Sequence, residues 1–180
     1  MAGTLSLATE LERLASALES DAASASRISL AGIAERIAKN LGVRTEEIAI
    51  MGVSNKWHHL HFLVPESLKQ VGFIPLSSTS AVAARTARES RPDIINNFAH
   101  VRHATVFEGI KVGNEAAEVI QKMISAPILS GEKVVGVIQV SRKGPDVKSS
   151  GPDFTADDLG SILALCKPLG KLLRHITAEE

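Results

Sequence analysis

The hydrophobic pattern of this sequence predicts an α+β domain, with helices at both ends and strands between them. Near the N-terminus, leucines spaced by four, three and four residues form one helical stripe: Leu7, Leu11, Leu14 and Leu18. Alternation with a period of two follows in residues 46–64, and a β-hairpin pattern centred on Ser130-Gly131 comes later. Because these periods distinguish amphipathic helices from strands, the expected order is two helices, strands, a helix, strands and a final helix.

A polar stretch over residues 20–26 separates the first helix from a second one. The second helix places apolar residues on one side: Ile28, Leu30, Ile33, Ala34, Ile37 and Leu41. Gly42 follows at the position where a left-handed residue commonly ends a helix, so we expect a C-terminal cap there.

Two strands are expected next, over residues 46–53 and 57–64, with a turn at 54–56. Successive side chains of a strand point to opposite faces, so the second strand has one mixed and one apolar face. The mixed face holds Trp57, His59, His61 and Leu63, and the apolar face holds Leu60, Phe62 and Val64. We expect the apolar face to pack on the terminal helices, which leaves the mixed face to a pocket or to solvent.

The middle of the chain alternates short elements with loops. The expected elements are a short strand or loop over 65–79, a helix over 81–90, a short strand over 93–97, an irregular helix near 100–109, and hairpin strands over 119–129 and 133–141. Ser80 or Thr79 is the expected N-cap of the helix, because hydroxyl side chains accept from its free amides.

The last helix begins near Thr155 and carries a narrow apolar stripe with alternating spacings of three and four: Leu159, Ile162, Cys166, Leu169, Leu173 and Ile176. A stripe of this width is typical of a helix–helix seam. We expect the seam to face a second copy of the chain, while Leu163, Leu165 and Leu172 cover the chain's own sheet.

Composition limits the classes of function. With 180 residues, 44% of them hydrophobic, the chain has enough apolar material for a real core. The formal net charge is zero, so the basic footprint of a nucleic-acid or anionic-membrane binder is not visible. The N-terminus lacks the basic stretch of a signal peptide, and the single cysteine, Cys166, cannot form an internal disulfide. We therefore expect a cytoplasmic protein that binds neither nucleic acid nor membrane.

Three segments carry a resemblance to a known family. They are the helix-to-strand segment 80–97, the hairpin segment 124–141 with its Pro127 and Gly136, and the start of the last helix at 154–159. Together, in this order, they resemble the GAF domain family over about residues 25–178. The resemblance implies a GAF-like (PAS-related) central antiparallel sheet, with terminal helices on one face and a ligand pocket on the other.

The resemblance also bears on function. GAF domains bind cyclic nucleotides, tetrapyrroles, haem or metabolites, or bind nothing and mediate dimers, and they usually regulate another domain. Bilin-binding members use a cysteine near the pocket, whereas Cys166 lies on the last helix. Free-methionine-sulfoxide reductases of this fold need several cysteines, and the spaced Asn-Lys-Phe-Asp-Glu set of cyclic-nucleotide-binding phosphodiesterases is not assembled here. The cofactor and the ligand are therefore unknown from the sequence.

The pocket is expected between the mixed face of 57–63 and the segments 77–85 and 96–107, and 98–110 is its expected cover. The candidate ligand-binding residues are Trp57, His59, His61, Ser80, Asn97, Phe98, His100, His103 and Phe107. A pair of histidines two apart on a strand can also hold a metal if His100 or His103 supplies a third ligand, although solvent-facing histidines are the simpler interpretation. Asn96 offers a donor and an acceptor to a ligand, or serves the turn that follows its strand.

A row of arginines lies nearby: Arg85, Arg88 and Arg91. It can bind a phosphate or a carboxylate, or form a solvated helix face. No nucleophile, paired-carboxylate or phosphate-loop motif is present in the sequence, and Cys166 lies on an apolar stripe typical of core or interface.

These observations predict a non-catalytic small-molecule-sensing or regulatory domain in signal transduction, acting through dimerisation or a partner protein. Residues 1–22 are expected to be an N-terminal amphipathic dimerisation helix, and 23–180 the GAF-like sensory domain. A homodimer that binds an unidentified small molecule is the expected assembly. Two alternatives stay open: a metal- or haem-binding enzyme or sensor that uses the histidines, and a dimerisation module whose pocket is filled by its own side chains.

Overall fold

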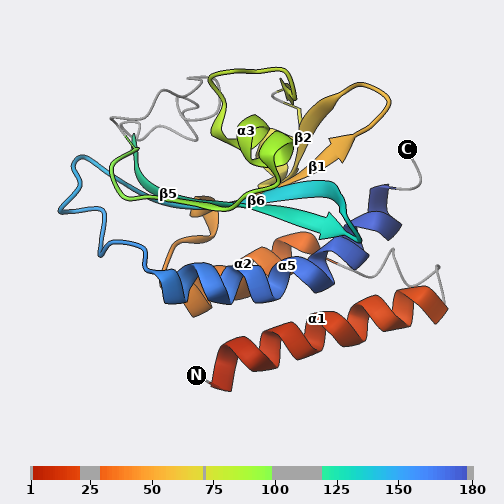
Figure 1. The fold of residues 1–180 in the computed structure, drawn as a ribbon. Coiled ribbons are helices and arrows are strands. Elements are labelled where there is room, and N and C mark those ends of the chain that lie inside the picture. The colour runs from red at the N-terminus through yellow and green to blue at the C-terminus, as the bar shows by residue number, and fades with distance from the viewer. Residues whose placement is uncertain (1, 21–28, 71, 99–118, 178–180) are drawn as a thin grey trace.

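A computed structural model describes residues 2–20, 29–70, 72–98 and 119–177 of the chain. One antiparallel sheet forms its centre (Figure 1). The strands are β1 (Ile48–Ser54), β2 (His59–Val64), β3 (Phe73–Pro75), β4 (Asp93–Ile95), β5 (Val119–Ser130) and β6 (Lys133–Gly144). They lie in the order β3-β2-β1-β6-β5-β4, so the long β5–β6 hairpin is central. This arrangement confirms the predicted α+β fold.

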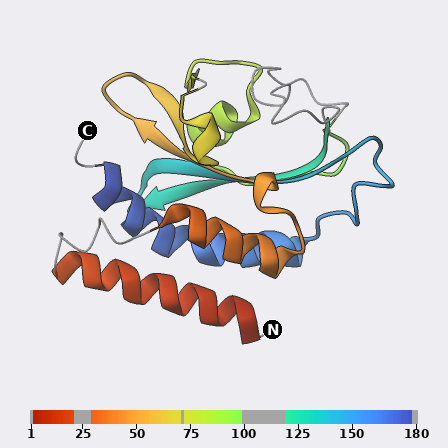
Figure 2. The same cartoon turned by 180° about the vertical axis from the view of Figure 1, so that it is seen from behind.

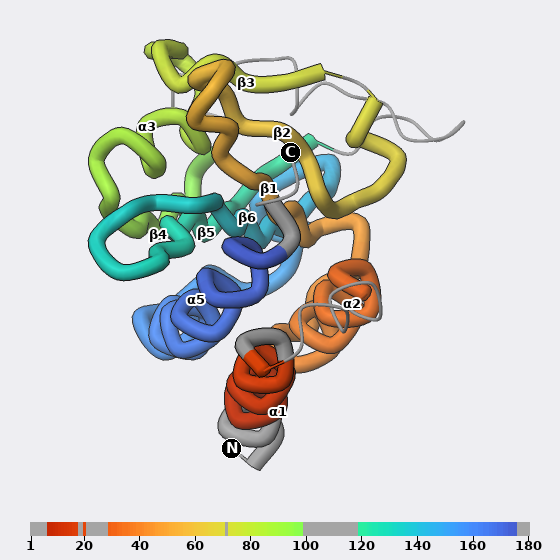
Figure 3. The backbone as a smooth tube through the Cα atoms, turned by 90° about the vertical axis from the view of Figure 1, so that its right-hand side faces the viewer, coloured from red at the N-terminus to blue at the C-terminus, as the bar shows by residue number. Residues whose placement is uncertain are grey.

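The helices divide between the two faces of this sheet. They are α1 (Ala2–Ser20), α2 (Leu30–Leu41), α3 (Val82–Glu89) and α5 (Ala156–Thr177), with short 3-10 turns at Thr45–Glu47 and Glu66–Leu68. Figures 1 and 2 show α2 and α5 against one face, α1 beneath them, and α3 on the opposite face. Viewed from the side, α1 forms an outer layer next to α2 and α5 (Figure 3). The predicted placement of the terminal helices on one face is confirmed.

Local sequence signals explain both ends of α2 and the start of α5. The Ser29 hydroxyl accepts the Gly32 amide at 3.1 Å, and Gly42 ends α2 with a φ of 66°. Before α5, the Thr155 hydroxyl accepts the Asp158 amide while the Asp158 carboxylate accepts the Thr155 amide.

The prediction of the α3 cap is wrong. Ala81 occupies the N-cap position, and the Ser78 hydroxyl accepts the Ala81 amide at 3.1 Å. Neither Ser80 nor Thr79 caps the helix, because α3 begins at Val82, one or two residues later than a cap at those positions allows.

The expected strands are present with shifted ends, since β1 begins at Ile48 rather than at 46 and β6 runs to Gly144 rather than to 141. In the β5–β6 hairpin Ser130 pairs with Lys133, and Gly131 occupies the turn with a φ of 63°. The β1–β2 turn is longer than expected, since Ser54 pairs with His59 and residues 55–58 form the turn. Trp57 therefore lies in a turn rather than in β2, and its side chain is 65% exposed.

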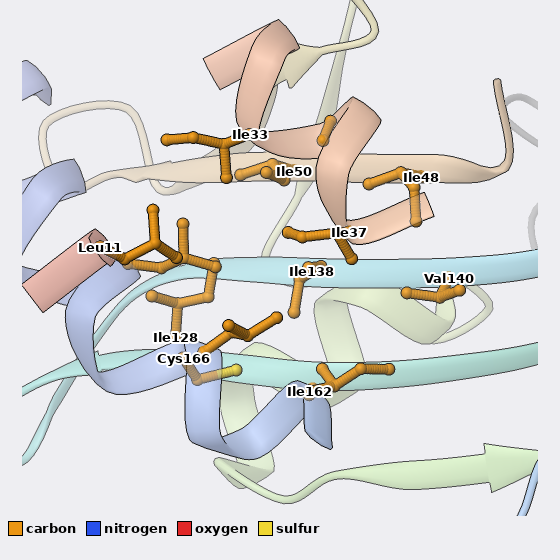
Figure 4. Packing of buried hydrophobic residues seen from close by; sticks show 14 of the residues in the cluster. Leu11, Ile33, Ile37, Ile48, Ile50, Ile128, Ile138, Val140, Ile162 and Cys166 are labelled. Carbon is orange, nitrogen blue, oxygen red and sulfur yellow. The ribbon is translucent and has the colours of Figure 1, made fainter. Parts of the chain in front are cut away.

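The largest core lies between the sheet and the terminal helices (Figure 4). Residues from six elements meet there: Leu11 of α1, Ile33 and Ile37 of α2, Ile48 and Ile50 of β1, Ile128 of β5, Ile138 and Val140 of β6, and Ile162 and Cys166 of α5. Burial of these side chains is the main source of stability for this layer.

The predicted facing of β2 is wrong. Leu60 and Phe62 pack with Met51, Val137 and the α3 residue Ala83, on the face opposite the terminal helices. The terminal helices cover mainly the central strands, so the helix side of β2 near the sheet edge needs fewer apolar residues. A register shift between Ile50 and Met51 then turns Val64 back into the terminal-helix core.

The predicted division of the last helix is wrong for its seam and for Leu163, whereas Leu165 and Leu172 are buried in the chain's own core as expected. Ile162, Cys166, Leu169 and Leu173 of the expected partner-facing seam are buried in the chain's own core, and Leu163 is 40% exposed. The seam residues pack on the chain's own sheet because α5 lies directly against β5. The side chains of Leu18 and Ile176, like residue Ile28, lie outside the part that the structure describes.

Helix α1 is held on the terminal-helix layer by apolar and ionic contacts. Leu7, Leu11 and Ala15 are buried, whereas Leu14 of the predicted stripe is 37% exposed. Ion pairs join Glu12 to Lys171 of α5 and a second α1 carboxylate to Arg36 of α2. None of the helices in the described part of the chain combines the length and apolar character required to span a bilayer.

Candidate functional site

The α3 face of the central hairpin carries buried polar side chains among apolar ones. Ser125 of β5 and Gln139 of β6 are paired across the two strands, and both are buried. The Gln139 amide nitrogen donates to the Ser125 hydroxyl at 3.2 Å, and the Ser125 and Thr86 hydroxyls are 2.7 Å apart. The Thr86 hydroxyl donates to the Val82 carbonyl at 3.0 Å.

These contacts form a directional chain of hydrogen bonds. Each hydroxyl has one hydrogen, and Thr86 uses its own on Val82. Ser125 therefore donates to Thr86 and accepts from Gln139. The chain joins the centre of the sheet to α3, so each buried hydroxyl is satisfied, as buried polar groups must be.

Apolar side chains surround this polar chain on the same face. One group comes from β1, β2, β6 and α3: Met51, Leu60, Phe62, Val137 and Ala83. The other comes from α3, β4, β5 and the segment after β4: Val82, Ile95, Ile120, Met123 and Phe98. Ser141, which pairs with Met123, is also buried. This mixture of apolar surface with a few neutral polar groups suits orientation of an uncharged ligand rather than acid–base chemistry.

The arginines next to this face already have partners in the protein. Arg85 pairs with Asp93 at 3.0 Å, and Arg91 pairs with Glu89 at 3.4 Å. Arg88 donates to the carbonyls of Leu76 and Ser78, the latter at 2.6 Å. The row therefore secures α3 and the loop before it, which favours the structural interpretation over an anion site.

Two of the predicted site residues lie on the other face of the sheet. His59 and His61 alternate with Leu60 and Phe62, which pack on the α3 side, so the two histidines lie on the terminal-helix face. His61 pairs there with Gly52, where a Cβ would lie 3.1 Å from the His61 ring. His59 stacks on Phe73 with ring centroids 4.3 Å apart and meets His61 edge to face. The sheet separates this pair from Ser80 and Phe98, so the expected single pocket does not contain both groups.

The remaining predicted residues are placed as follows. Trp57 is exposed in the β1–β2 turn, with the Lys56 ammonium 4.8 Å from its ring centroid. Ser80 is half-buried in the loop before α3, Asn97 is exposed, and Phe98 is buried in the α3-face core.

The metal interpretation depends on residues outside the described part. His100, His103 and Phe107 lie there, as does the irregular helix expected near 100–109. Within the described ranges, no three His, Cys, Asp or Glu side chains are grouped to hold a metal ion.

Cys166 is buried on α5, and burial raises the pKa of its thiol from 9.0 to about 12. A thiol with such a pKa is protonated at neutral pH, so Cys166 is a core residue and not a ready nucleophile.

The sequence alone did not predict a site role for Thr86, Ser125 and Gln139. A signal for two of them was present, because Ser125 and Gln139 interrupt the apolar runs 123–129 and 134–140 of the hairpin. In a strand buried on both faces, such an interruption marks a position with a specific partner.

Comparison with known proteins identifies the fold. The family model described as GAF domain matches residues 5–172. The chain is similar to the GAF domain of an Acinetobacter phosphoenolpyruvate-protein phosphotransferase, at 18% identity and a TM-score of 0.64, covering 94% of this chain and 93% of that one. It is similar to the free methionine-R-sulfoxide reductase of Neisseria meningitidis, at 16% identity, a TM-score of 0.61 and coverage of 94% and 89%.

A third similar structure is the GAF domain of a two-component sensor histidine kinase from Bacillus halodurans, at 17% identity, a TM-score of 0.56 and coverage of 84% and 97%. A comparison with curated proteins found no match. At these identities the structural likeness concerns the fold alone.

Proposed function

Since the chain belongs to the GAF domain family, we propose that it is a non-catalytic, small-molecule-sensing domain that regulates a partner protein or a second copy of itself. GAF domains are commonly sensory or regulatory parts of signalling proteins. The observation that carries the proposal is the buried polar chain of Thr86, Ser125 and Gln139 on the α3 face.

The two faces of the central hairpin differ in a way that supports this site. At the middle of the hairpin, Ile124, Ile138 and Val140 give the terminal-helix face only apolar surface. The buried Arg142 of that face lies further along β6, over the Phe154 ring. On the α3 face, neutral polar groups lie among apolar side chains, which is the usual composition of a small-molecule site. We propose that the ligand is uncharged where it meets the sheet, because Arg85 and Arg88 are engaged by protein groups.

The proposal assigns no catalysis to the chain. The similarity to a methionine-sulfoxide reductase raises that possibility through the fold alone. The sequence has one cysteine, whereas reductases of this fold need several, and the raised pKa of Cys166 disfavours its thiolate.

We still propose a homodimer, but with an interface other than the seam of the last helix. The seam residues Leu169 and Leu173 are buried in the monomer, so they are not available to a partner. Leu14 of α1 and Leu163 of α5 are apolar and partly exposed on the terminal-helix layer. We propose that this layer, rather than the seam, meets the second copy.

Native mass spectrometry of the purified chain tests both parts of the proposal in one measurement. We expect a dimer mass and an additional small-molecule mass that is lost on denaturation. Gln139→Leu should lose the extra mass because it removes the polar group from the α3 face, while His59→Gln, on the opposite face, should retain it. A bare monomer, or a ligand released by His59→Gln and retained by Gln139→Leu, would contradict the proposal.

A further inference from the structure

Asn96 connects the two sides of the sheet at its β4 edge. The residue directly follows β4, and its side chain makes two hydrogen bonds with the backbone of Phe154. The Asn96 amide nitrogen donates to the Phe154 carbonyl at 3.0 Å, and the Asn96 oxygen accepts the Phe154 amide at 2.8 Å. The side-chain amide thus satisfies both backbone groups of a residue that lies 58 positions away in sequence.

Phe154 belongs to the start of α5. It precedes Thr155, whose hydroxyl and amide form the reciprocal cap with Asp158. Its ring is buried in the terminal-helix core, and the Arg142 guanidinium lies 4.8 Å above the ring centroid. Arg142 in turn donates to the Gly42 carbonyl at the end of α2. A displacement of Phe154 therefore reaches the starting point of α5 and the end of α2.

The other side of Asn96 is fixed by the α3-face core. Its neighbours Ile95 and Phe98 are buried there with Val82, the first residue of α3. Because Asn96 lies between these two anchors in sequence, its backbone moves with the α3-face core while its side chain holds Phe154. Tightly packed anchors transmit displacement rather than absorb it.

We infer that Asn96 is a coupling residue, through which a displacement of the α3-face core is passed around the sheet edge to the first turn of α5. The inference goes beyond the proposed function, since it concerns a connection within the chain and holds whether or not a ligand binds. It does not rely on movement within the central sheet. The coupling element has two states, in which the two hydrogen bonds between Asn96 and Phe154 are either formed or broken.

A double-mutant cycle read by amide hydrogen exchange tests this coupling in the ligand-free protein. Phe98→Leu perturbs the α3-face core, and the amides of Asp158 and Leu159 report on the first turn of α5, where they bond to Thr155. We expect Phe98→Leu to accelerate exchange at both amides several-fold. In the Asn96→Ala background, Phe98→Leu should add nothing at these amides while still accelerating exchange in the α3-face core at Met123.

Controls separate coupling from general destabilisation. Asn97→Ala, at the exposed neighbouring position, should leave the response at Leu159 unchanged. Asn96→Ala alone should accelerate exchange of the Phe154 amide about tenfold, because that amide loses its acceptor. If Asn96→Ala fails to fold, Asn96→Asp keeps the acceptor, loses the donor, and should reduce the response.

Additive effects of Phe98→Leu and Asn96→Ala at Leu159 would overturn the inference. So would a Phe98→Leu variant in which the α3-face core loosens while the first turn of α5 exchanges as in the parent protein. Neither result depends on a ligand, so failure here and failure of the proposed function are distinguishable.

Discussion

Gly170 is the point at which α5 approaches the end of β5 most closely, and Gly170→Ala should destabilise the protein. A Cβ at this position would lie 1.9 Å from the Leu129 carbonyl oxygen and 2.8 Å from its carbonyl carbon. Ordinary van der Waals contact needs 3.4–4 Å, so either the helix or the strand has to move. The obstacle is backbone, which cannot rotate away as the tip of a side chain can.

The magnitude follows from two opposing terms. Overpacking of a well-packed core typically costs about 1–3 kcal/mol, and a clash with backbone belongs at the upper end of that range. Replacement of glycine by alanine in a helix gains about 1 kcal/mol of intrinsic propensity. The net expectation is a loss of about 2 kcal/mol, which lowers the Tm of a chain of this size by about 4–8 °C.

The same helix supplies the matched control. Gly160 is exposed, and a Cβ there meets nothing within 4 Å, so Gly160→Ala should stabilise by up to about 1 kcal/mol. Urea unfolding followed by circular dichroism measures both variants under one set of conditions. If Gly170→Ala proves as stable as Gly160→Ala, the close seating of α5 on β5 is wrong, and with it the argument that the Leu169–Leu173 seam is used inside the monomer.

Two further predictions concern buried groups. Ser125→Ala should lower the free energy of unfolding by about 1–3 kcal/mol in urea titrations, because it leaves Gln139 without its acceptor and Thr86 without its donor. An unchanged unfolding midpoint would contradict the directional chain of hydrogen bonds. Cys166 should react with a thiol reagent at pH 8 only after unfolding. The free energy of unfolding should fall as the pH rises from 9.0 towards about 12, because the unfolded thiol ionises in this range and the folded one does not. A Cys166→Ala variant that shows the same alkaline loss would contradict this assignment.

The order of elements could be predicted from the sequence because each one carries a local signal. Ser130 and Gly131 mark the turn of the long hairpin, and Gly42 marks the end of α2 with a left-handed backbone. These signals depend on backbone conformations that few residues adopt at low energy, so they act without information from distant parts of the chain.

The facing of β2 and of α5 could not be predicted in this way. Periodicity shows that Leu60 and Phe62 share a face, but the identity of that face depends on which elements cover it. Both faces of this sheet are covered, so an apolar face fits either the terminal helices or α3. The same ambiguity affected the Leu169–Leu173 stripe, since a narrow stripe fits a sheet in the same chain as well as a helix of a second copy.

Candidate site residues failed for a related reason. Histidines at alternate positions of a strand are site candidates by residue type, yet they alternate with Leu60 and Phe62, which pack on the α3 side, and so lie on the terminal-helix face. Ser125 and Gln139 have less distinctive side chains, and their importance comes from burial and mutual distance, which the sequence does not contain. The role of residues 1–22 as a separate dimerisation element stays a prediction.

The position of the polar chain also limits how a signal could reach the terminal helices. A route straight through the sheet would have to shift strands that are tightly confined, since a Cβ at Gly136 would lie 2.4 Å from the Met51 carbonyl oxygen and 2.7 Å from a Leu173 methyl group. Interiors packed this closely resist local displacement. At the β4 edge, by contrast, two hydrogen bonds of Asn96 join the α3-face core to the start of α5 without passing through the sheet. A sensor built on this sheet is therefore expected to signal around its edge, which is why exchange at Asp158 and Leu159 is the informative measurement.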